Sequence, residues 1–218
     1  MPRSLRLLFL LGFAGLLGLV VAYEVTGHLR SAQQEQEIAA HAADIYRSPT
    51  SFVAGNPEGD VSVVAFLDYN CPFCRQGAPD LAKLIATDGK VRLVLKELPV
   101  LGKDSEDVAR IALASIPQGK YFELHQRLFA EPGRATKAKA LRIASELGLD
   151  MGRLEAGMDD PAITAILLEN TKLAKDIGVR GVPFYLVGDR VLGEGKDLYG
   201  RLAQGVADIR AHGCRNTC

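Results

Sequence analysis

The chain contains no tryptophan, no internal repeat and no low-complexity tract, and its charges cancel. Twenty-six basic residues balance 26 acidic ones, and no basic stripe runs along the sequence. Proteins that bind nucleic acid usually carry a clustered excess of positive charge, so we predict no nucleic-acid partner. With 218 residues, of which 48% are hydrophobic, the chain is long enough for one or two globular domains.

Charged residues are missing from one long segment near the N-terminus. Arg3 and Arg6 precede Leu7–Tyr23, which carries no charge. This segment is long for the core of a signal peptide and short for a membrane span. We predict a signal anchor in the inner membrane or, as the alternative, a cleaved signal peptide within residues 1–30. In both cases the following chain lies in the periplasm or another extracytoplasmic compartment, which permits disulfides.

Residues 31–50 are predicted to form a linker that contains a short amphipathic helix. The apolar side chains on one side of the helix Gln33–Arg47 are Ile38, Ala42, Ile45 and Tyr46. Two interpretations fit this weak stripe. The helix is either a linker that lifts the domain from the membrane or packs on it, or it forms a homodimer with a second copy.

After residue 50 the pattern becomes that of an α/β protein. Val61–Leu67 is a β-branched and nearly unbroken apolar run, which is typical of a strand covered on both faces. A helix is predicted to begin near Cys71 with Pro72 at its first position, and a second strand follows at Val91–Leu98. This order predicts a βαβ unit with two parallel strands.

A block of helices interrupts the α/β pattern at about residues 104–177. Beyond it, Phe184–Val187 and Arg190–Leu192 flank a Gly-Asp pair, which predicts a β-hairpin. A last helix is predicted from Lys196 to about residue 211. A tail of residues 212–218 follows and holds two cysteines.

Cysteine is scarce, with four in the chain, and two of them lie where the first helix is predicted to begin. The thiolate is the form that attacks a disulfide, and the positive end of a helix dipole favours this charged form at Cys71. Cys74 lies one turn later, close enough to form a disulfide with Cys71 or to attack a mixed disulfide there. Spacing and order predict Cys71 as the nucleophile and Cys74 as the resolving thiol.

A Cys-x-x-Cys pair alone also occurs in haem, zinc and structural sites. Arg75 stands where c-type haem attachment needs a histidine. The other two cysteines, Cys214 and Cys218, lie on a tail and do not have the usual spacing of a zinc ribbon. A purely structural disulfide would close too small a loop to constrain the unfolded chain much. These observations favour a redox role for this pair over a zinc site or a structural disulfide, and we predict no metal and no cofactor.

The segment LDYNCPFCRQ around this pair, together with GVRGVPFYLVG further along, resembles the DsbA-type thiol–disulfide oxidoreductases of the thioredoxin superfamily. The resemblance spans about Phe52–Ala211 and includes LVLKELPVLGKDSEDVARIALA and YFELHQRLF. It implies an α/β fold: a thioredoxin-fold domain at residues 51–211 with an inserted helical domain at about 104–177. The helical block predicted from the sequence lies at the same place.

The same resemblance implies a cis peptide bond between Val182 and Pro183, packed beside the active-site disulfide. These two residues would bind an extended substrate chain as an added strand. Phe73 departs from the pattern of the family's strongest oxidants, in which a histidine at this position helps to stabilise the thiolate. We therefore expect a less oxidising couple, although valine before the proline is typical of the oxidases.

Titratable residues near the strand ends are further candidates. Asp68 either shuttles a proton from Cys74 or serves as a turn residue before the helix. Lys96 and Glu97 end the second strand, where we predict solvated charges of little energetic weight. His125 lies on the apolar stripe of its helix, which predicts a core histidine with one hydrogen-bond partner.

The tail residues His212, Cys214 and Cys218 admit three interpretations. They form a second disulfide, a redox relay to the first cysteine pair, or a site for copper(I) or zinc.

The sequence thus predicts an extracytoplasmic oxidoreductase that exchanges disulfides with substrate proteins through Cys71 and Cys74, in the oxidising direction. A membrane redox partner would regenerate its disulfide. The alternatives are a disulfide isomerase or reductase, and a copper-handling protein that uses the tail cysteines.

Overall fold

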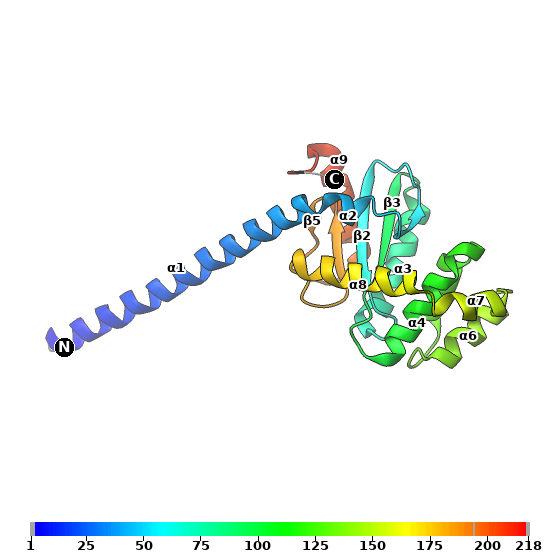
Figure 1. Cartoon of the computed structure of the whole chain (residues 1–218). Helices are drawn as coiled ribbons and strands as arrows, with labels where there is room; N and C mark the ends of the chain where they lie inside the picture. Colours follow the sequence, from blue (N-terminus) through cyan, green and yellow to red (C-terminus); the bar gives the residue numbers. More distant parts are fainter. Residues whose placement is uncertain (1–2, 194, 217–218) are drawn as a thin grey trace.

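In residues 3–193 and 195–216, which the computed structural model describes, five strands form one mixed sheet in the order β1-β3-β2-β4-β5 (Figure 1). The strands are β1 (Phe52–Gly55), β2 (Val61–Leu67), β3 (Val91–Glu97), β4 (Phe184–Val187) and β5 (Arg190–Val191). The pair β2–β3 is parallel, and the pairs β1–β3, β2–β4 and β4–β5 are antiparallel. The predicted βαβ unit and hairpin are therefore confirmed.

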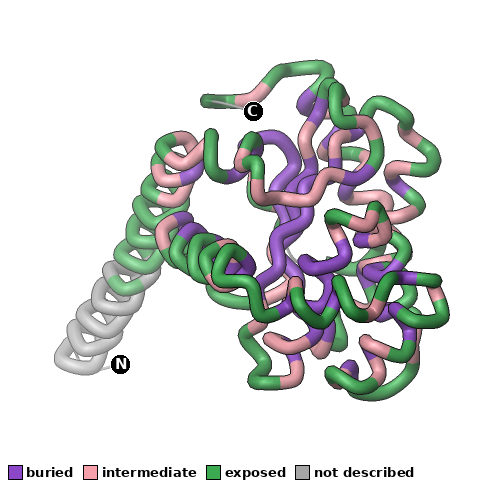
Figure 2. The backbone as a smooth tube through the Cα atoms, turned by 45° about the vertical axis from the view of Figure 1, so that its right-hand side comes forward, coloured by how far each residue is buried: buried purple, intermediate pink, exposed green. Residues whose placement is uncertain are grey.

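Helices cover both faces of the sheet, as the apolar run of β2 predicted. Successive side chains of a strand point to opposite faces. Val63 and Ala65 accordingly pack in the cluster that includes α3 (Pro72–Thr87) and α9 (Leu198–His212). Val64 and Phe66 pack in a second cluster on the other face. Figure 2 shows these strands as the buried centre of the molecule.

The helical block lies between β3 and β4 in the chain. It contains α4 (Lys103–Ala114), the 3-10 helix η1 (Ile116–Gln118), α5 (Tyr121–Ala130), α6 (Lys137–Glu146), α7 (Met151–Met158) and α8 (Pro161–Asp176). Helix α8 joins the block to the sheet. Ile163 near its start packs in the first cluster, whereas Leu173 and Ala174 near its end pack in the second cluster, against the sheet.

The linker helix packs on the sheet of its own chain. Helix α1 (Arg3–Ala40) projects away from the domain (Figure 1), and its last turns lead into α2 (Ala42–Tyr46). Ile38, Ile45 and Tyr46 are buried in the second cluster, and the Tyr46 hydroxyl donates a hydrogen bond to the carbonyl oxygen of Gly188 at 2.9 Å. The main apolar side chains of the predicted stripe therefore cover the sheet rather than a second copy.

For much of the predicted leader the structure describes the helix but not the side chains. The side chains of residues 3–18 and 20 are outside the description, and Leu7–Tyr23 falls largely on them. Among the described residues, no helix is both long and apolar enough to cross a membrane.

Candidate functional site

The two thiols lie at the start of α3, directly after the central strand. Cys71 is the N-cap residue with an extended backbone, and Pro72 follows at the first helical position, where its missing N–H loses no helical hydrogen bond. Both cysteines are free thiols and both are buried, Cys74 completely. Phe73, in contrast, is 67% exposed. The two sulfurs are therefore covered, whereas the phenyl ring of Phe73, which stands between the two cysteines in the sequence, is exposed on the surface.

The loop before β4 contacts the first thiol. The Val182–Pro183 peptide bond is cis, as the family resemblance implied. The Sγ of Cys71 donates a hydrogen bond to the carbonyl oxygen of Val182 at 3.2 Å. The fold thus brings together the two sequence segments that carry the resemblance.

Cys74 differs from Cys71 in its surroundings. Burial raises the pKa of the Cys74 thiol well above its ordinary value, and the charges of Cys71 and Asp68 raise it further. A hydrogen bond from the backbone of Asp68 acts in the opposite direction. Cys74 is therefore a protonated thiol at neutral pH, which suits a residue that waits behind the attacking sulfur.

Asp68 holds the active-site loop in place. It is 1% exposed, and its Oδ1 accepts a hydrogen bond from the backbone N–H of Asn70 at 2.8 Å. Its Oδ2 accepts one from the backbone N–H of Leu101 at 2.9 Å, which connects the loop to the segment after β3. These contacts fit the turn role, which was one of the two interpretations of Asp68.

The prediction that Lys96 and Glu97 are solvated was wrong. They are 2% and 3% exposed, because helices cover both faces of β3 at its end. The ammonium group of Lys96 donates to the carbonyl oxygen of Asp44 at 2.6 Å, and burial lowers its pKa to about 8. Glu97 points to the opposite face, toward α5, because neighbouring residues of a strand alternate.

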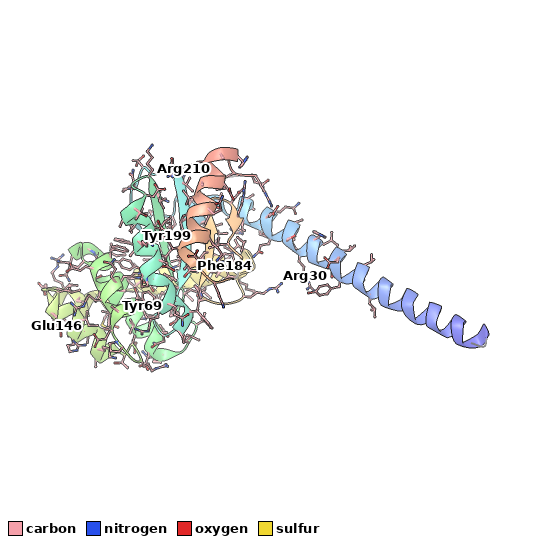
Figure 3. The ribbon with its side chains drawn as sticks, turned by 180° about the vertical axis from the view of Figure 1, so that it is seen from behind. Arg30, Tyr69, Glu146, Phe184, Tyr199 and Arg210 are labelled. Carbon is pink, nitrogen blue, oxygen red and sulfur yellow. The ribbon has the colours of Figure 1, made fainter. Side chains whose placement is uncertain are left out.

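Glu97 is the centre of a buried polar cluster under the active-site loop, which we call the Glu97 cluster; its members are Glu97, Tyr69, Tyr121 and His125. The Oε1 of Glu97 accepts hydrogen bonds from the hydroxyls of Tyr69 at 2.7 Å and Tyr121 at 2.5 Å. Burial raises the pKa of Glu97 to about 7, although both phenol hydrogen bonds act to lower it. In Figure 3, Tyr69 lies toward the helical block, in which Glu146 at the end of α6 is labelled.

His125 completes this cluster as a neutral core residue, as predicted. Its Nδ1 lies 2.9 Å from the Tyr69 hydroxyl, and burial lowers its pKa to about 3. Since the single phenol proton of Tyr69 is donated to Glu97, we assign the proton of the imidazole to Nδ1. The cluster thereby connects the loop before Cys71 to helix α5. Sequence reasoning missed Tyr69 and Tyr121. The only signal was at Tyr121, which lies on the same apolar stripe of α5 as His125.

Arg75 connects the start of α3 to the helical block through hydrogen bonds. Its guanidinium donates hydrogen bonds to the backbone carbonyl oxygens of Phe129 at 2.7 Å, Gly133 at 3.0 Å and Tyr69 at 3.4 Å, and also to that of Glu131. A planar guanidinium can serve several acceptors at once, which a lysine cannot do in the same geometry.

We expect Arg75→Met to lower the free energy of unfolding by about 2–4 kcal/mol, because several charge-assisted hydrogen bonds are lost. Urea unfolding monitored by circular dichroism measures this change. Arg153→Met is the matched control, since Arg153 is exposed on α7 and should change the free energy by less than about 0.5 kcal/mol. Equal effects of the two substitutions would show that the carbonyl contacts do not hold the loop.

The tail packs near the β4–β5 turn. Cys214 is disulfide-bonded, and Cys218, its predicted partner, lies outside the described residues. A Cβ atom placed on Gly188 would lie 2.9 Å from the Cys214 sulfur, so the tail contacts this turn closely. In the described part of the chain, no three His, Cys, Asp or Glu residues gather as metal ligands. The disulfide interpretation of the tail fits these observations.

The domain that carries this site is similar to known proteins. A family model described as a DSBA-like thioredoxin domain matches residues 62–206. A thioredoxin-like oxidoreductase from Silicibacter pomeroyi DSS-3 is 40% identical, with a TM-score of 0.74 over 78% of this chain and 97% of that one. The thiol-disulfide exchange protein alpha-DsbA2 from Wolbachia pipientis is 28% identical, with a TM-score of 0.76 over 83% of this chain and 98% of that one.

Two further similarities support less, one because of its low identity and the other because it covers a small part of the relative. A linker-deletion mutant of ScsC from Proteus mirabilis covers 97% of this chain with a TM-score of 0.80, but its 22% identity supports the fold alone. The curated relative Na(+)/H(+) antiporter NhaA 3 of Salinispora tropica is 30% identical over 140 residues. This chain spans only 22% of the antiporter's length, so the similarity concerns one segment of that protein.

Proposed function

Because the chain belongs to the DSBA-like thioredoxin family, we propose that it exchanges disulfides with substrate proteins through Cys71 and Cys74. The observation that carries this proposal is the contact of 3.2 Å between the Cys71 sulfur and the Val182 carbonyl oxygen, beside the cis bond to Pro183. A nucleophilic thiol at a helix start thus lies next to backbone that can pair with an extended chain. The fully buried Cys74 is one turn away.

In the oxidising direction, a substrate thiolate attacks the Cys71 sulfur of the Cys71–Cys74 disulfide. The bond between the two cysteines breaks, a mixed disulfide with Cys71 forms, and Cys74 leaves as a thiolate that then takes up a proton. A second substrate thiolate attacks the substrate sulfur of the mixed disulfide and releases Cys71. Two electrons pass from the substrate dithiol to the protein, and an external oxidant, which we propose to be a membrane partner, removes them.

The reduction potential of the Cys71–Cys74 couple tests the direction of this exchange. We would measure it against glutathione in a Cys214→Ser/Cys218→Ser variant, so that one cysteine pair alone reports. We expect about −180 to −120 mV, the range of couples that transfer their disulfide to substrates. A value near about −270 mV would instead assign a reductase that needs a source of electrons. If the protein did not exchange disulfides with glutathione at all, the proposed oxidoreductase activity itself would be excluded.

We also propose that the domain works outside the cytoplasm, because a disulfide-bonded Cys214 suits an oxidising compartment. A fusion to a reporter enzyme that is active only after export tests this; an inactive fusion contradicts it.

A homodimer would need a surface other than the buried side chains of Ile38, Ile45 and Tyr46. Sedimentation of the full chain and of a chain that begins at residue 31 tests whether α1 supplies that surface.

A further inference from the structure

The end of α1 contacts the beginning of the loop that carries Val182 and Pro183. The side-chain amide of Gln34, which is half-buried, donates hydrogen bonds to the carbonyl oxygens of Ile177 at 2.9 Å and Gly178 at 3.3 Å. Ile177 caps the C-terminus of α8, and the last carbonyl groups of a helix lack partners within the helix. A donor from a distant part of the chain thus fixes the point at which α8 ends and the loop begins (Figure 1).

Gly178 turns the chain from α8 toward the active site. Its φ of +73° lies in the left-handed region that favours glycine. Beyond it, the carbonyl oxygen of Val182 accepts the hydrogen bond from the Cys71 sulfur, and Phe184 pairs with Phe66 at the start of β4. The loop is therefore held at β4 by strand pairing and at α8 by the contacts of Gly178. Its conformation between these two ends determines where the backbone of Val182 lies.

The apolar side chains of the linker and of this loop belong to the same cluster. Ile38, one turn after Gln34 on α1, is fully buried in the second cluster. Val179 and Val182 of the loop pack against that cluster, and Val182 also packs against the first cluster, which contains both thiols. Because protein interiors are close-packed, a shift of one part of a cluster is felt by its neighbours. The linker therefore supports the loop from the face of the sheet opposite to α3.

A substrate chain that pairs with the backbone at Val182 depends on the position of this loop, whereas a small thiol does not. Strand addition forms hydrogen bonds between two main chains, and each bond weakens when its distance or angle changes. A small thiol reacts with the disulfide at the Cys71 sulfur and needs no such pairing. A contact that holds the loop should therefore matter for protein and peptide substrates and not for small ones.

We propose that Gln34 is a positioning residue, whose hydrogen bonds to Ile177 and Gly178 hold the loop before β4 where the backbone of Val182 can bind an extended substrate. This inference rests on the proposed function and adds the N-terminal linker to the segments that determine how a substrate chain binds. Gln34 acts on the loop and not on the sulfurs, so the exchange of electrons with the cysteine pair follows the steps given above.

Gln34→Met tests the proposal because it removes the donor and keeps a side chain of similar length and helix propensity. The assay is single-turnover oxidation of an extended peptide with a pair of cysteines by the oxidised full chain. We expect the half-saturating peptide concentration to rise about fivefold, the factor that corresponds to one net hydrogen bond. The limiting rate, and the rate constant for oxidation of dithiothreitol, should stay within about twofold of wild type, because binding is weakened and the sulfur chemistry is not.

Gln36→Met is the matched control. Gln36 is the same residue type on the same helix, but it is exposed. Its substitution should leave the half-saturating peptide concentration, the limiting rate and the dithiothreitol rate constant unchanged.

Three results would overturn the inference. A half-saturating concentration for Gln34→Met within about twofold of wild type would show that the contact does not position the loop. An equal rise in Gln36→Met would assign the effect to α1 as a whole. A loss of the same size with dithiothreitol would show that the substitution acts on the sulfurs and not on the binding of a chain. Failure of the wild-type protein to oxidise either compound would instead contradict the proposed function, so the two failures are distinguishable.

Discussion

Cys71→Ser should abolish disulfide exchange, with a rate loss of roughly a thousandfold or more, because a hydroxyl does not replace the attacking thiolate. Cys74→Ser should behave differently. It keeps Cys71 beside Val182, so a mixed disulfide still forms, but the second sulfur that would resolve it is missing. Incubation of each variant with a peptide disulfide, followed by mass spectrometry, separates the two outcomes.

This difference follows from burial. The Cys74 sulfur is completely covered, whereas the Cys71 sulfur lies at the contact between α3 and the loop before β4. A substrate sulfur therefore reaches Cys71 first. If Cys71→Ser accumulated the mixed disulfide and Cys74→Ser did not, the assigned roles of the two cysteines would be reversed.

Glu97→Ala should lower the free energy of unfolding by about 3–5 kcal/mol, because it leaves the hydroxyls of Tyr69 and Tyr121 without their shared acceptor in a buried place. Glu97→Gln should be far milder, since its amide oxygen can still accept both hydrogen bonds. Glu155→Gln is the matched control, because Glu155 is exposed on α7 and its loss should be close to zero. Equal effects of Glu97→Ala and Glu155→Gln in urea unfolding would show that the Glu97 cluster does not stabilise the fold.

The free energy of unfolding should also depend on pH, through Glu97 and His125. The pKa of Glu97 rises from 4.5 to about 7 on folding, so the folded state holds this proton more tightly than the unfolded state. Stability is therefore lost as pH rises from about 4.5 through about 7, by roughly 3 kcal/mol. His125 acts in the opposite direction, because its pKa falls from 6.5 to about 3 and stability is gained as pH rises between these values.

The two effects oppose each other between about pH 4.5 and 6.5, so the wild-type curve should be nearly flat there. Glu97→Gln removes the falling part, and its stability should rise up to about pH 6.5 and then level off. Thermal or urea unfolding at several pH values measures both curves. Parallel curves for wild type and Glu97→Gln would contradict the raised pKa of Glu97.

Elements with a strong local signal could be predicted from the sequence. The apolar run of β2 and the proline after Cys71 predicted a central strand and a helix start, and both were confirmed with little shift. The short edge strand β1 was not predicted, because Phe52–Gly55 has too few residues to show a periodic pattern and pairs on one side only, with β3. The stripe at Ile38 and Ile45 could be seen, but the sequence did not reveal which surface it covers.

The sequence by itself therefore determined the candidate site at Cys71 and Cys74, because a strand end, a helix cap and the spacing of two cysteines are local properties. Only the tertiary structure decided what surrounds these sulfurs. The Val182 carbonyl and the Glu97 cluster come from segments far apart in the chain. Whether a charge such as that of Glu97 is buried depends on which helix covers it, and that contact is formed only when the whole chain has folded.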